Sequence, residues 1–274
     1  GDGDRVAGIK SHSRTGGAIE EQARVVIGAD GLHSLVAKAV RAPEYDVKPP
    51  LTTNYYTYYS GFAADDLEEY VRDYQAVGCF PTHDGLTLIA VLWPSIRFDE
   101  VRADIEGHVK KVLESTPGVA DRRQDAKREE KWSGTAGVPN YFRQPFGPGW
   151  ALVGDAGYNK DPITAQGISD AFIDAEALTT ALDDGWSGRR PPGDALAEYQ
   201  ASRDHRAKPM YDFTCQLATL EPSPPHMQRL FAALRGNQEA TNQFYSAITG
   251  SRPLPAFMNP DNVDRIVASA GIRR

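Results

Sequence analysis

The pattern of apolar and polar positions predicts a chain in which strands and helices are mixed. Short apolar runs bounded by turn residues are typical of strands, and apolar residues that recur every three or four positions are typical of helices. The strand pattern occurs at residues 6–10, 22–27, 51–61, 70–74, 75–80, 86–93, 129–138 and 150–153. The helical pattern occurs at residues 33–40, 98–115, 166–183, 194–208, 210–220, 226–235, 237–249 and 261–268.

Glycine and proline positions divide these elements further. The pair Gly16-Gly17 predicts a turn, so residues 6–27 are expected to form an antiparallel hairpin whose second strand runs into a turn at Asp30. The prolines around residues 43–50 indicate a domain boundary. Pro209 is expected to kink the long helical pattern around it or to restart it.

The stretch from Trp150 to Asp170 carries the strongest chemical pattern. A short apolar run ends in Gly154-Asp155, a loop follows, and a helix begins near Gln166. The strand would carry the carboxylate to its end, and the N-terminus of the helix would point back at the same place. Free N–H groups and the helix dipole make such a terminus a binding site for anions or carbonyl oxygens. A carboxylate at a strand end can bind sugar-like hydroxyls. An ordinary strand-turn-helix would leave the same pattern.

A second stretch, residues 23–37, repeats this arrangement. An apolar strand ends at Gly28, the turn contains Asp30 and Gly31, and a short helix follows. Gly31 suits a close approach of a ligand or a helix, because a side chain there would collide with either.

Both stretches resemble fingerprints of the p-hydroxybenzoate hydroxylase-like FAD monooxygenases. The later one is similar to G-D-A-A-H, a spacer and P-x-x-G-Q-G, with matches at Gly154, Asp155, Ala156, Pro162, Gln166 and Gly167 and departures at Gly157, Tyr158 and Ala165. The earlier one is similar to G-A-D-G-x-x-S-x-V-R, with matches at Gly28, Ala29, Asp30, Gly31, Ser34 and Val36 and a departure at Ala37. Two fingerprints in this order are more specific than either alone.

The resemblance implies roles for individual residues toward FAD. Asp155 would bind the ribityl chain, and Pro162 would lie beside the flavin ring. The backbone N–H groups of Gly167 and Ile168 would face the pyrimidine edge of the ring. Asp30 and Gly31 would lie near the pyrophosphate, and the departure at Ala37 puts a role toward the pyridine nucleotide in doubt.

The resemblance also implies an architecture. The fold class would be α/β with mixed α+β character: a partial Rossmann-like FAD-binding domain in segments 1–42 and 141–185, interrupted by a β-sheet substrate domain at 43–140, with a helical region at 186–274. The family's first fingerprint, G-x-G-x-x-G, is not found. Gly1-Asp2-Gly3-Asp4 holds a G-x-G pair with no strand before it. We therefore expect that the ADP-binding βαβ unit is absent from this chain.

The tyrosine-rich strand at residues 51–61 has two interpretations. Tyr56 and Tyr58 would share one face of the strand. They could form an aromatic wall of a substrate pocket, since a sheet covers the substrate side of the flavin in the family. The simpler interpretation is that they are the packed rings of a half-buried strand.

Composition narrows the possible partners. Thirty Lys and Arg against 37 Asp and Glu give a formal charge of −7, which argues against nucleic acid and against a basic membrane patch. The longest apolar run, at residues 86–93, is too short to span a bilayer. Cys79 and Cys215 are expected to be buried thiols in a reducing, cytoplasmic compartment. The six histidines are scattered, so no metal site is predicted.

The sequence thus predicts an FAD-dependent oxidoreductase. The resemblance implies a monooxygenase that uses NAD(P)H and a flavin hydroperoxide to hydroxylate an aromatic or polyketide-like small molecule. It identifies no catalytic side chain. Alternatives are a flavin-dependent halogenase, although no W-x-W-x-I-P stretch is present, a prenyl reductase, or a truncated fragment that binds no flavin. A missing N-terminal segment or a homo-oligomer would complete the protein.

Overall fold

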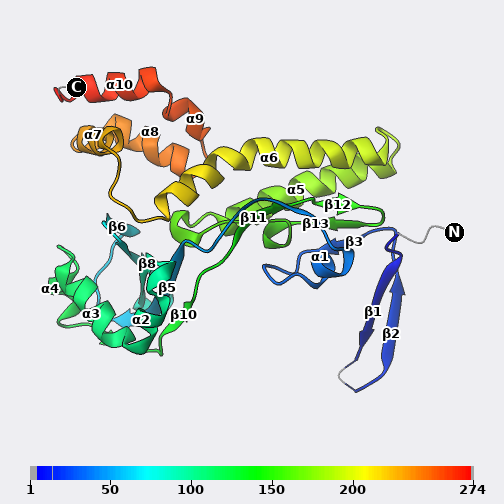
Figure 1. Cartoon of the computed structure of the whole chain (residues 1–274), viewed down its shortest axis with the longest axis horizontal. Coiled ribbons are helices and arrows are strands. Elements are labelled where there is room, and N and C mark those ends of the chain that lie inside the picture. The colour runs from blue at the N-terminus through cyan, green and yellow to red at the C-terminus, as the bar shows by residue number, and fades with distance from the viewer. Residues whose placement is uncertain (1–4, 14, 273–274) are drawn as a thin grey trace. The chain divides into compact units, whose positions relative to one another are not determined.

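The computed structural model describes residues 5–13 and 15–272, so the stretch Gly1–Asp4 considered above lies outside the described residues. The chain divides into two compact units (Figure 1). The first comprises Gly1–Lys48 and Pro139–Asp212, and the second comprises Pro49–Val138 and Phe213–Arg274. Each unit contains both strands and helices, which confirms the predicted mixed α/β class.

A small sheet of the first unit carries both predicted fingerprints. Its strands are β3 (Val26–Gly28), β12 (Phe146–Gly147) and β13 (Trp150–Leu152), in the order β12-β13-β3. β13 runs parallel to β3, with Ala151 opposite Ile27. Because the carboxyl ends of parallel strands meet at one edge of a sheet, the turns after β3 and β13 lie next to each other.

The hairpin prediction is partly wrong. β1 (Gly8–His12) and β2 (Ala18–Gln22) do form an antiparallel hairpin, but β2 ends before the Asp30 turn. The residues of β2 are all exposed and three of the five are polar, whereas β3 is apolar enough to join β13 in the core. The chain leaves the hairpin at Ala23, and the N–H of Val26 then bonds the carbonyl of Gly149. The predicted second strand is therefore two strands in two sheets.

A second sheet of this unit supports the loop after β13. Its antiparallel strands are β4 (Glu44–Lys48), β11 (Asn140–Arg143) and β14 (Tyr158–Asn159), in the order β14-β11-β4. The ring of Phe142 lies between those of Tyr45 and Tyr158, with centroids 5.6 and 4.6 Å away. This aromatic stack fixes β14, which begins three residues after Asp155.

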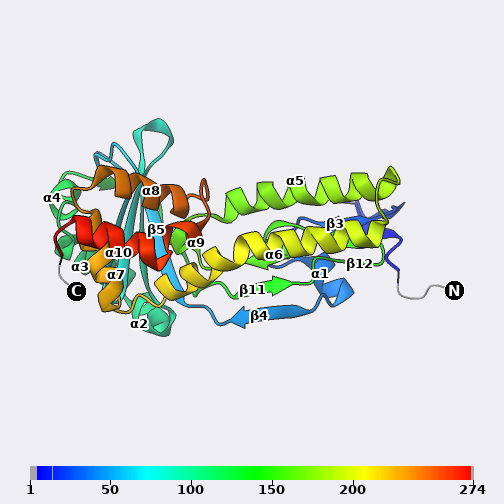
Figure 2. The ribbon, with the colours of Figure 1, turned by 90° about the horizontal axis from the view of Figure 1, so that it is seen from above.

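Three helices complete the first unit: α1 (Leu35–Val40), α5 (Gly167–Trp186) and α6 (Pro192–Leu217), which continues into the second unit. Figure 2 shows α5 and α6 side by side. Leu178 and Leu182 of α5 pack with Tyr199 of α6 in one core cluster. Pro209 lies inside α6 and does not divide it, contrary to a restart of the helix there.

The second unit is built on an antiparallel sheet in the order β10-β5-β8-β7-β6, with β9 also paired to β5. The strands are β5 (Thr52–Ser60), β6 (Glu68–Arg72), β7 (Gln75–Pro81), β8 (Thr87–Pro94), β9 (Lys127–Arg128) and β10 (Ser133–Thr135). The strand predicted at 129–138 is longer than the observed one, because only β10 within that range pairs with β5; β9, which precedes the range, pairs with β5 separately.

Helices α2 (Phe98–Ala103), α3 (Ile105–Ser115) and α4 (Ala120–Arg123) follow β8. A core cluster joins residues of α3 to β5, β7 and β8, including Val109, Leu113, Ile89 and Cys79. Both Cys79 and Cys215 are buried, as predicted.

The second unit ends in α7 (Pro225–Leu234), α8 (Gln238–Ile248), α9 (Leu254–Phe257) and α10 (Pro260–Ser269). These agree with the predicted helical region. The observed units divide that region at residue 213, because α6 starts in one unit and ends in the other.

Candidate functional site

The turn after β3 uses its acidic residue to begin a helix. One carboxylate oxygen of Asp30 accepts the N–H of Leu35 at 2.6 Å and that of Val36 at 3.2 Å. Burial acts to raise the pKa of Asp30, but hydrogen bonds from Ser34 and from these amides outweigh it and hold the pKa below its usual value. Asp30 thus caps α1 with one oxygen.

Gly31 occupies the same turn with φ at +73°, a conformation that side-chain-bearing residues rarely adopt. A Cβ there would meet no described atom within 4 Å. The expected collision with a helix is therefore absent, and backbone conformation accounts for the glycine. The open space beside Gly31 is part of a hollow that is also lined by the turn after β13.

The turn after β13 carries Asp155 in a different environment. Asp155 lies in a short 3₁₀ turn (Gly154–Ala156) and is half-buried. Burial raises its pKa; Lys160 opposes this shift and Asp170 adds to it. Among the described residues no donor bonds its carboxylate, whereas its backbone carbonyl accepts the hydroxyl of Tyr141 at 2.7 Å. The carboxylate group is available to a ligand.

The N-terminus of α5 faces this carboxylate. A Cβ built on Gly167 would have only one described neighbour within 4 Å, the Oδ1 of Asp155 at 4.0 Å. The first amides of an α-helix have no intrahelical partner. In α5 the side chain of Gln166 does not cap them. The dipole of a helix of 20 residues adds partial positive charge at this end. The carboxylate of Asp155, an acceptor, and the first amides of α5, which are donors, therefore face the same space.

These elements enclose a hollow of about 510 Å³. It is lined by Ala29, Gly31, Val153, Gly154, Asp155, Gly167, Ile168, Ala171, Phe172 and Ala175. The structure thus brings together five of the residues predicted from the fingerprints. Asp30 and Pro162 do not line it: Asp30 caps α1, and Pro162 is exposed in the 3₁₀ turn Pro162–Thr164.

The pattern of the predicted helix at 166–183 places Ile168, Phe172, Leu178 and Leu182 together on an apolar side that faces the core. For the N-terminal half of α5 this expectation is wrong. Ile168 is 78% and Phe172 74% exposed, while Asp170 and Asp174 are buried. Leu178 and Leu182 do face the core, as predicted. The helix buries its acids because basic residues meet them inside, and its apolar side chains line the hollow.

This buried charge cluster was missed in the sequence. Lys160, in the loop after Asp155, pairs with Asp170, and Arg206 of α6 pairs with both Asp170 and Asp174. In the sequence, Asp170 and Asp174 near the start of the predicted helix suit the helix dipole, and they lie four residues apart. Nothing in that spacing identifies bases supplied by distant segments. Through these ion pairs the cluster links the loop that contains Lys160 to α5 and α6.

Arg203 provides a second hidden anchor. Its side chain is fully buried, and it donates to the carbonyls of Gly157 at 3.1 Å and Arg143 at 3.0 Å. It also pairs with the neighbouring Asp204. This guanidinium thus links the backbone just after Asp155 to the end of β11 and fixes the position of the turn.

Tyr56 and Tyr58 lie on β5 in the second unit. They are partly buried, whereas Tyr55 and Tyr59 on the other face join the core cluster. The ring of Tyr58 lies edge-on to His83, with centroids 6.2 Å apart. This alternation agrees with the predicted shared face of Tyr56 and Tyr58.

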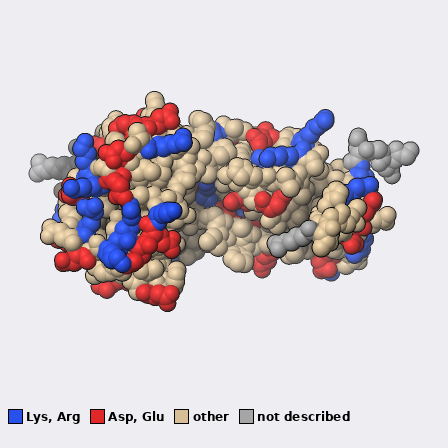
Figure 3. All heavy atoms as spheres, turned by 90° about the horizontal axis from the view of Figure 1, so that it is seen from below, with Lys and Arg blue, Asp and Glu red and all other residues tan. Residues whose placement is uncertain are grey.

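Surface charge is mixed. On the face drawn in Figure 3, acidic and basic side chains are interspersed, and neither sign forms a continuous field. In residues 5–13 and 15–272, no helix combines the length and apolarity needed to cross a bilayer. Over the same ranges, no three His, Cys, Asp or Glu side chains cluster as metal ligands would.

Comparison with known proteins agrees with the geometry. The model of a family described as "FAD binding domain" matches residues 1–214. No curated protein matches the chain. PqsL, a probable FAD-dependent monooxygenase from Pseudomonas aeruginosa, is 24% identical with a TM-score of 0.63, over 77% of this chain and 59% of its own.

Two further structures are similar over nearly the whole chain. The myxobacterial chondrochloren halogenase CndH is 16% identical with a TM-score of 0.72, over 98% of this chain and 66% of its own. A flavoprotein/dehydrogenase from Cytophaga hutchinsonii is 14% identical with a TM-score of 0.74, over 96% of this chain and 65% of its own. The chain thus spans less than two thirds of these structures. The likenesses confirm the predicted fold and the resemblance to FAD-dependent enzymes.

Proposed function

Because the chain belongs to the FAD binding domain family, we propose that it is part of an FAD-dependent monooxygenase. The observation that carries this proposal is the pair of Asp155 and the start of α5. A half-buried carboxylate with no donor among the described residues faces the first amides of α5, and a Cβ on Gly167 would have no other described atom within 4 Å. Burying such a carboxylate is unfavourable unless a partner binds it.

The residues present fit FAD. Asp155 would accept hydrogen bonds from the ribityl hydroxyls, and the amides of Gly167 and Ile168 would donate to the pyrimidine edge of the ring. Pro162 would flank the ring, and Asp30 and Gly31 would lie toward the pyrophosphate. Lys160 and Arg203 would hold the turn of Asp155 in place through their buried contacts.

Bound FAD would supply the activation of dioxygen and the transfer of one of its oxygen atoms to the substrate. The chain's own part is to bind and orient the ring and to favour negative charge at its pyrimidine edge. Preorganised amides and a helix dipole do this without rearranging. The apolar side chains of Ile168 and Phe172 would help exclude water from the hollow.

The proposed substrate is an aromatic or polyketide-like small molecule, and the proposed reductant is NADH or NADPH. Tyr56 and Tyr58, which are only partly buried, are the proposed aromatic wall. A PqsL structure holds 2-aminobenzoylacetate, an aromatic compound with a β-keto acid chain. That compound is therefore a suitable first probe.

An isotope experiment tests this function. The whole protein is incubated with FAD, NADH or NADPH and ¹⁸O₂, together with 2-aminobenzoylacetate or 4-hydroxybenzoate. The expected product gains one ¹⁸O atom, with the second atom of O₂ released as water and one reduced nicotinamide oxidised per turnover. Tyr56→Ala is expected to raise KM more than it lowers kcat, with the exposed Tyr245→Ala as control.

A parallel reaction with bromide or chloride tests the halogenase alternative, since the similarity to CndH extends over 98% of this chain. Product that carries halogen and no ¹⁸O would overturn the monooxygenase proposal in favour of that alternative. Nicotinamide oxidation with no labelled product from any aromatic probe would overturn the proposed substrate class.

A further inference from the structure

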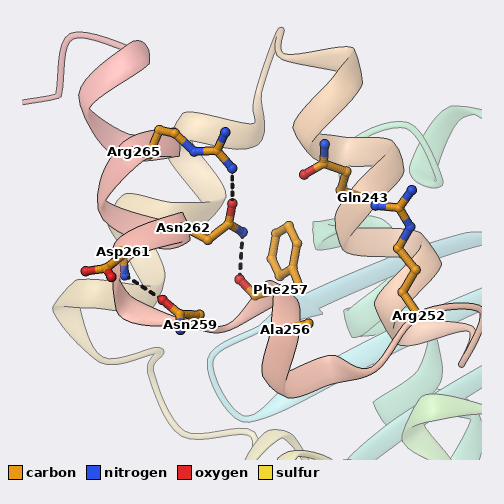
Figure 4. Close-up of a pocket in the computed structure, with 8 residues that line it drawn as sticks. All are labelled: Gln243, Arg252, Ala256, Phe257, Asn259, Asp261, Asn262 and Arg265. Carbon is orange, nitrogen blue, oxygen red and sulfur yellow. Dashed lines mark hydrogen bonds between the residues drawn. The ribbon is translucent and has the colours of Figure 1, made fainter.

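The second unit contains a cavity of about 740 Å³ beyond the residues that the family model matches. It is formed by α8, the loop after it, α9 and α10. Its lining residues are Gln243, Arg252, Ala256, Phe257, Asn259, Asp261, Asn262 and Arg265. Figure 4 shows Gln243 and Arg265 extending toward the same space from opposite helices, with Arg252 beside Gln243.

The cavity holds two positive charges that the chain does not neutralise. Neither Arg252 nor Arg265, both of which are exposed, forms an ion pair within residues 5–13 and 15–272, whereas Arg122, Arg143 and Arg206 do. Asp261 is the one acid in the lining, and in Figure 4 its carboxylate points away from Phe257. The charge that faces the cavity is therefore positive.

Arg265 is held in place by a short chain of hydrogen bonds. The amide group of Asn262 donates to the carbonyl of Phe257 at 2.8 Å and accepts from Arg265 at 2.5 Å. A guanidinium has five N–H donors in a rigid fork, so most of the donors of Arg265 are left for a ligand. A donor group fixed before binding loses little conformational entropy when a ligand arrives.

Apolar surface lies beside these donors. Phe257 is 5% exposed and its ring packs on Phe244, with centroids 5.5 Å apart. Ala256 adds a methyl group to the lining. The N-terminus of α10, capped by Asn259, adds partial positive charge. One fixed cationic donor, Arg265, and a second arginine, Arg252, beside a largely buried aromatic ring suit a molecule with an anionic head and an apolar body.

We propose that this cavity binds a small organic anion, with its carboxylate or phosphate held by Arg252 and Arg265 and its apolar body against Phe257. Arginine pairs with both oxyanions through two parallel N–H···O bonds. Gln243, whose amide nitrogen already donates to Glu239 at 3.3 Å, would donate a further hydrogen bond with its second N–H.

Calorimetric titration at low salt tests the site with three probes: phenyl phosphate, benzoate and inorganic phosphate. We expect one molecule of phenyl phosphate or benzoate to bind per chain. Arg252→Gln and Arg265→Gln should each weaken binding about tenfold or more, the loss for one charge-assisted hydrogen bond. Arg229→Gln, at an exposed arginine of α7 away from the cavity, should leave affinity unchanged.

Chemical modification provides a readout that needs no variant. Phenylglyoxal should modify Arg252 and Arg265 in the whole protein, and saturating phenyl phosphate should protect these two but not Arg229. Lack of binding by both organic probes at millimolar concentration, or equal affinity in the Arg→Gln variants, would overturn the site. Inorganic phosphate that binds as tightly as phenyl phosphate would overturn the role of the apolar body.

Discussion

At the scale of residues, two aspartates that look alike in the sequence have different environments. Asp30 and Asp155 both follow an apolar strand and a glycine. Asp30 caps a helix with two backbone bonds, and its pKa is lowered. Asp155 has no donor among the described residues, and burial raises its pKa. The sequence predicts both carboxylates at strand ends. It does not predict which of them accepts hydrogen bonds from the protein's own backbone.

Asp155→Ala should therefore lower flavin content in the whole protein while leaving its thermal stability nearly unchanged. Asp30→Ala should do the reverse, because it removes the acceptor of the Leu35 and Val36 amides at the start of α1, whose N-cap residue is Ser34; the loss should be comparable to that of an N-cap, about 0.5–2 kcal/mol. Flavin absorbance and thermal unfolding of both variants distinguish the two roles. Equal flavin content in Asp155→Ala and the wild type would contradict the assignment.

Asp174 should make stability depend on pH. Burial raises its pKa to about 6, with Arg206 and Arg203 opposing the shift. The folded state therefore holds this proton more strongly than the unfolded state, and stability falls as pH rises from about 4 through 6. The difference between the two pKa values sets an upper limit of about 3 kcal/mol.

The measurement is the free energy of unfolding of Asp174→Asn and wild type from pH 4 to 7. The wild type should lose stability relative to the variant as pH rises. Glu176→Gln, at an exposed acid of the same helix, serves as control and should show no such trend. A constant difference between Asp174→Asn and wild type would be evidence against a raised pKa.

At the scale of elements, helices and strands were predictable where apolar residues recur on one face along the whole element. β5, β8, α8 and α10 lie close to their predicted ranges. The predicted helix at 98–115 is instead α2 and α3, because Asp104 leaves the helical conformation and caps α3 through the N–H of Gly107 at 2.9 Å. The apolar period continues through this break, so periodicity alone does not reveal it.

Asp104→Ala should cost about 1 kcal/mol of stability, as loss of an N-cap typically does. Asp104→Asn should recover most of it, because an amide oxygen can accept the same bond. Urea unfolding of both variants, with the exposed Asp121→Ala as control, measures this. If Asp104→Ala unfolds at the wild-type midpoint, the cap contributes nothing to the folded state.

At the scale of the whole molecule, the sequence predicted a flavin-binding part built from distant segments. The pairing of β3 with β13 brings the two fingerprints together across more than a hundred residues. The ion pairs and hydrogen bonds of Lys160, Arg203 and Arg206 were not predicted, because their partners come from separate elements and single charged residues leave no periodic signal. The Tyr56 and Tyr58 wall stays a prediction.

Hydrogen exchange should locate the flavin within the molecule. Adding FAD to the whole protein should slow exchange of the amides of Gly167, Ile168 and Ser169, which have no intrahelical partner. Amides in the first turn of α8 should exchange at an unchanged rate, because that helix belongs to the second unit. Slowing in α8 without slowing at the start of α5 would place the ligand elsewhere.

The central claim is that the hollow at the start of α5 holds FAD, and two matched glycines test it most directly. Gly167 and Gly193 each lie in the first turn of a helix, and a Cβ on either meets no described atom closer than 4.0 Å. Valine should fold at both positions, but only at Gly167 would it enter the hollow.

The measurement is the dissociation constant for FAD, followed by flavin fluorescence, in the whole protein and in the two variants. We expect Gly193→Val to bind FAD as the wild type does and Gly167→Val to bind at least about tenfold more weakly, a loss of about 1.4 kcal/mol. Circular dichroism should show both variants folded. Wild-type affinity in a folded Gly167→Val variant would contradict the claim.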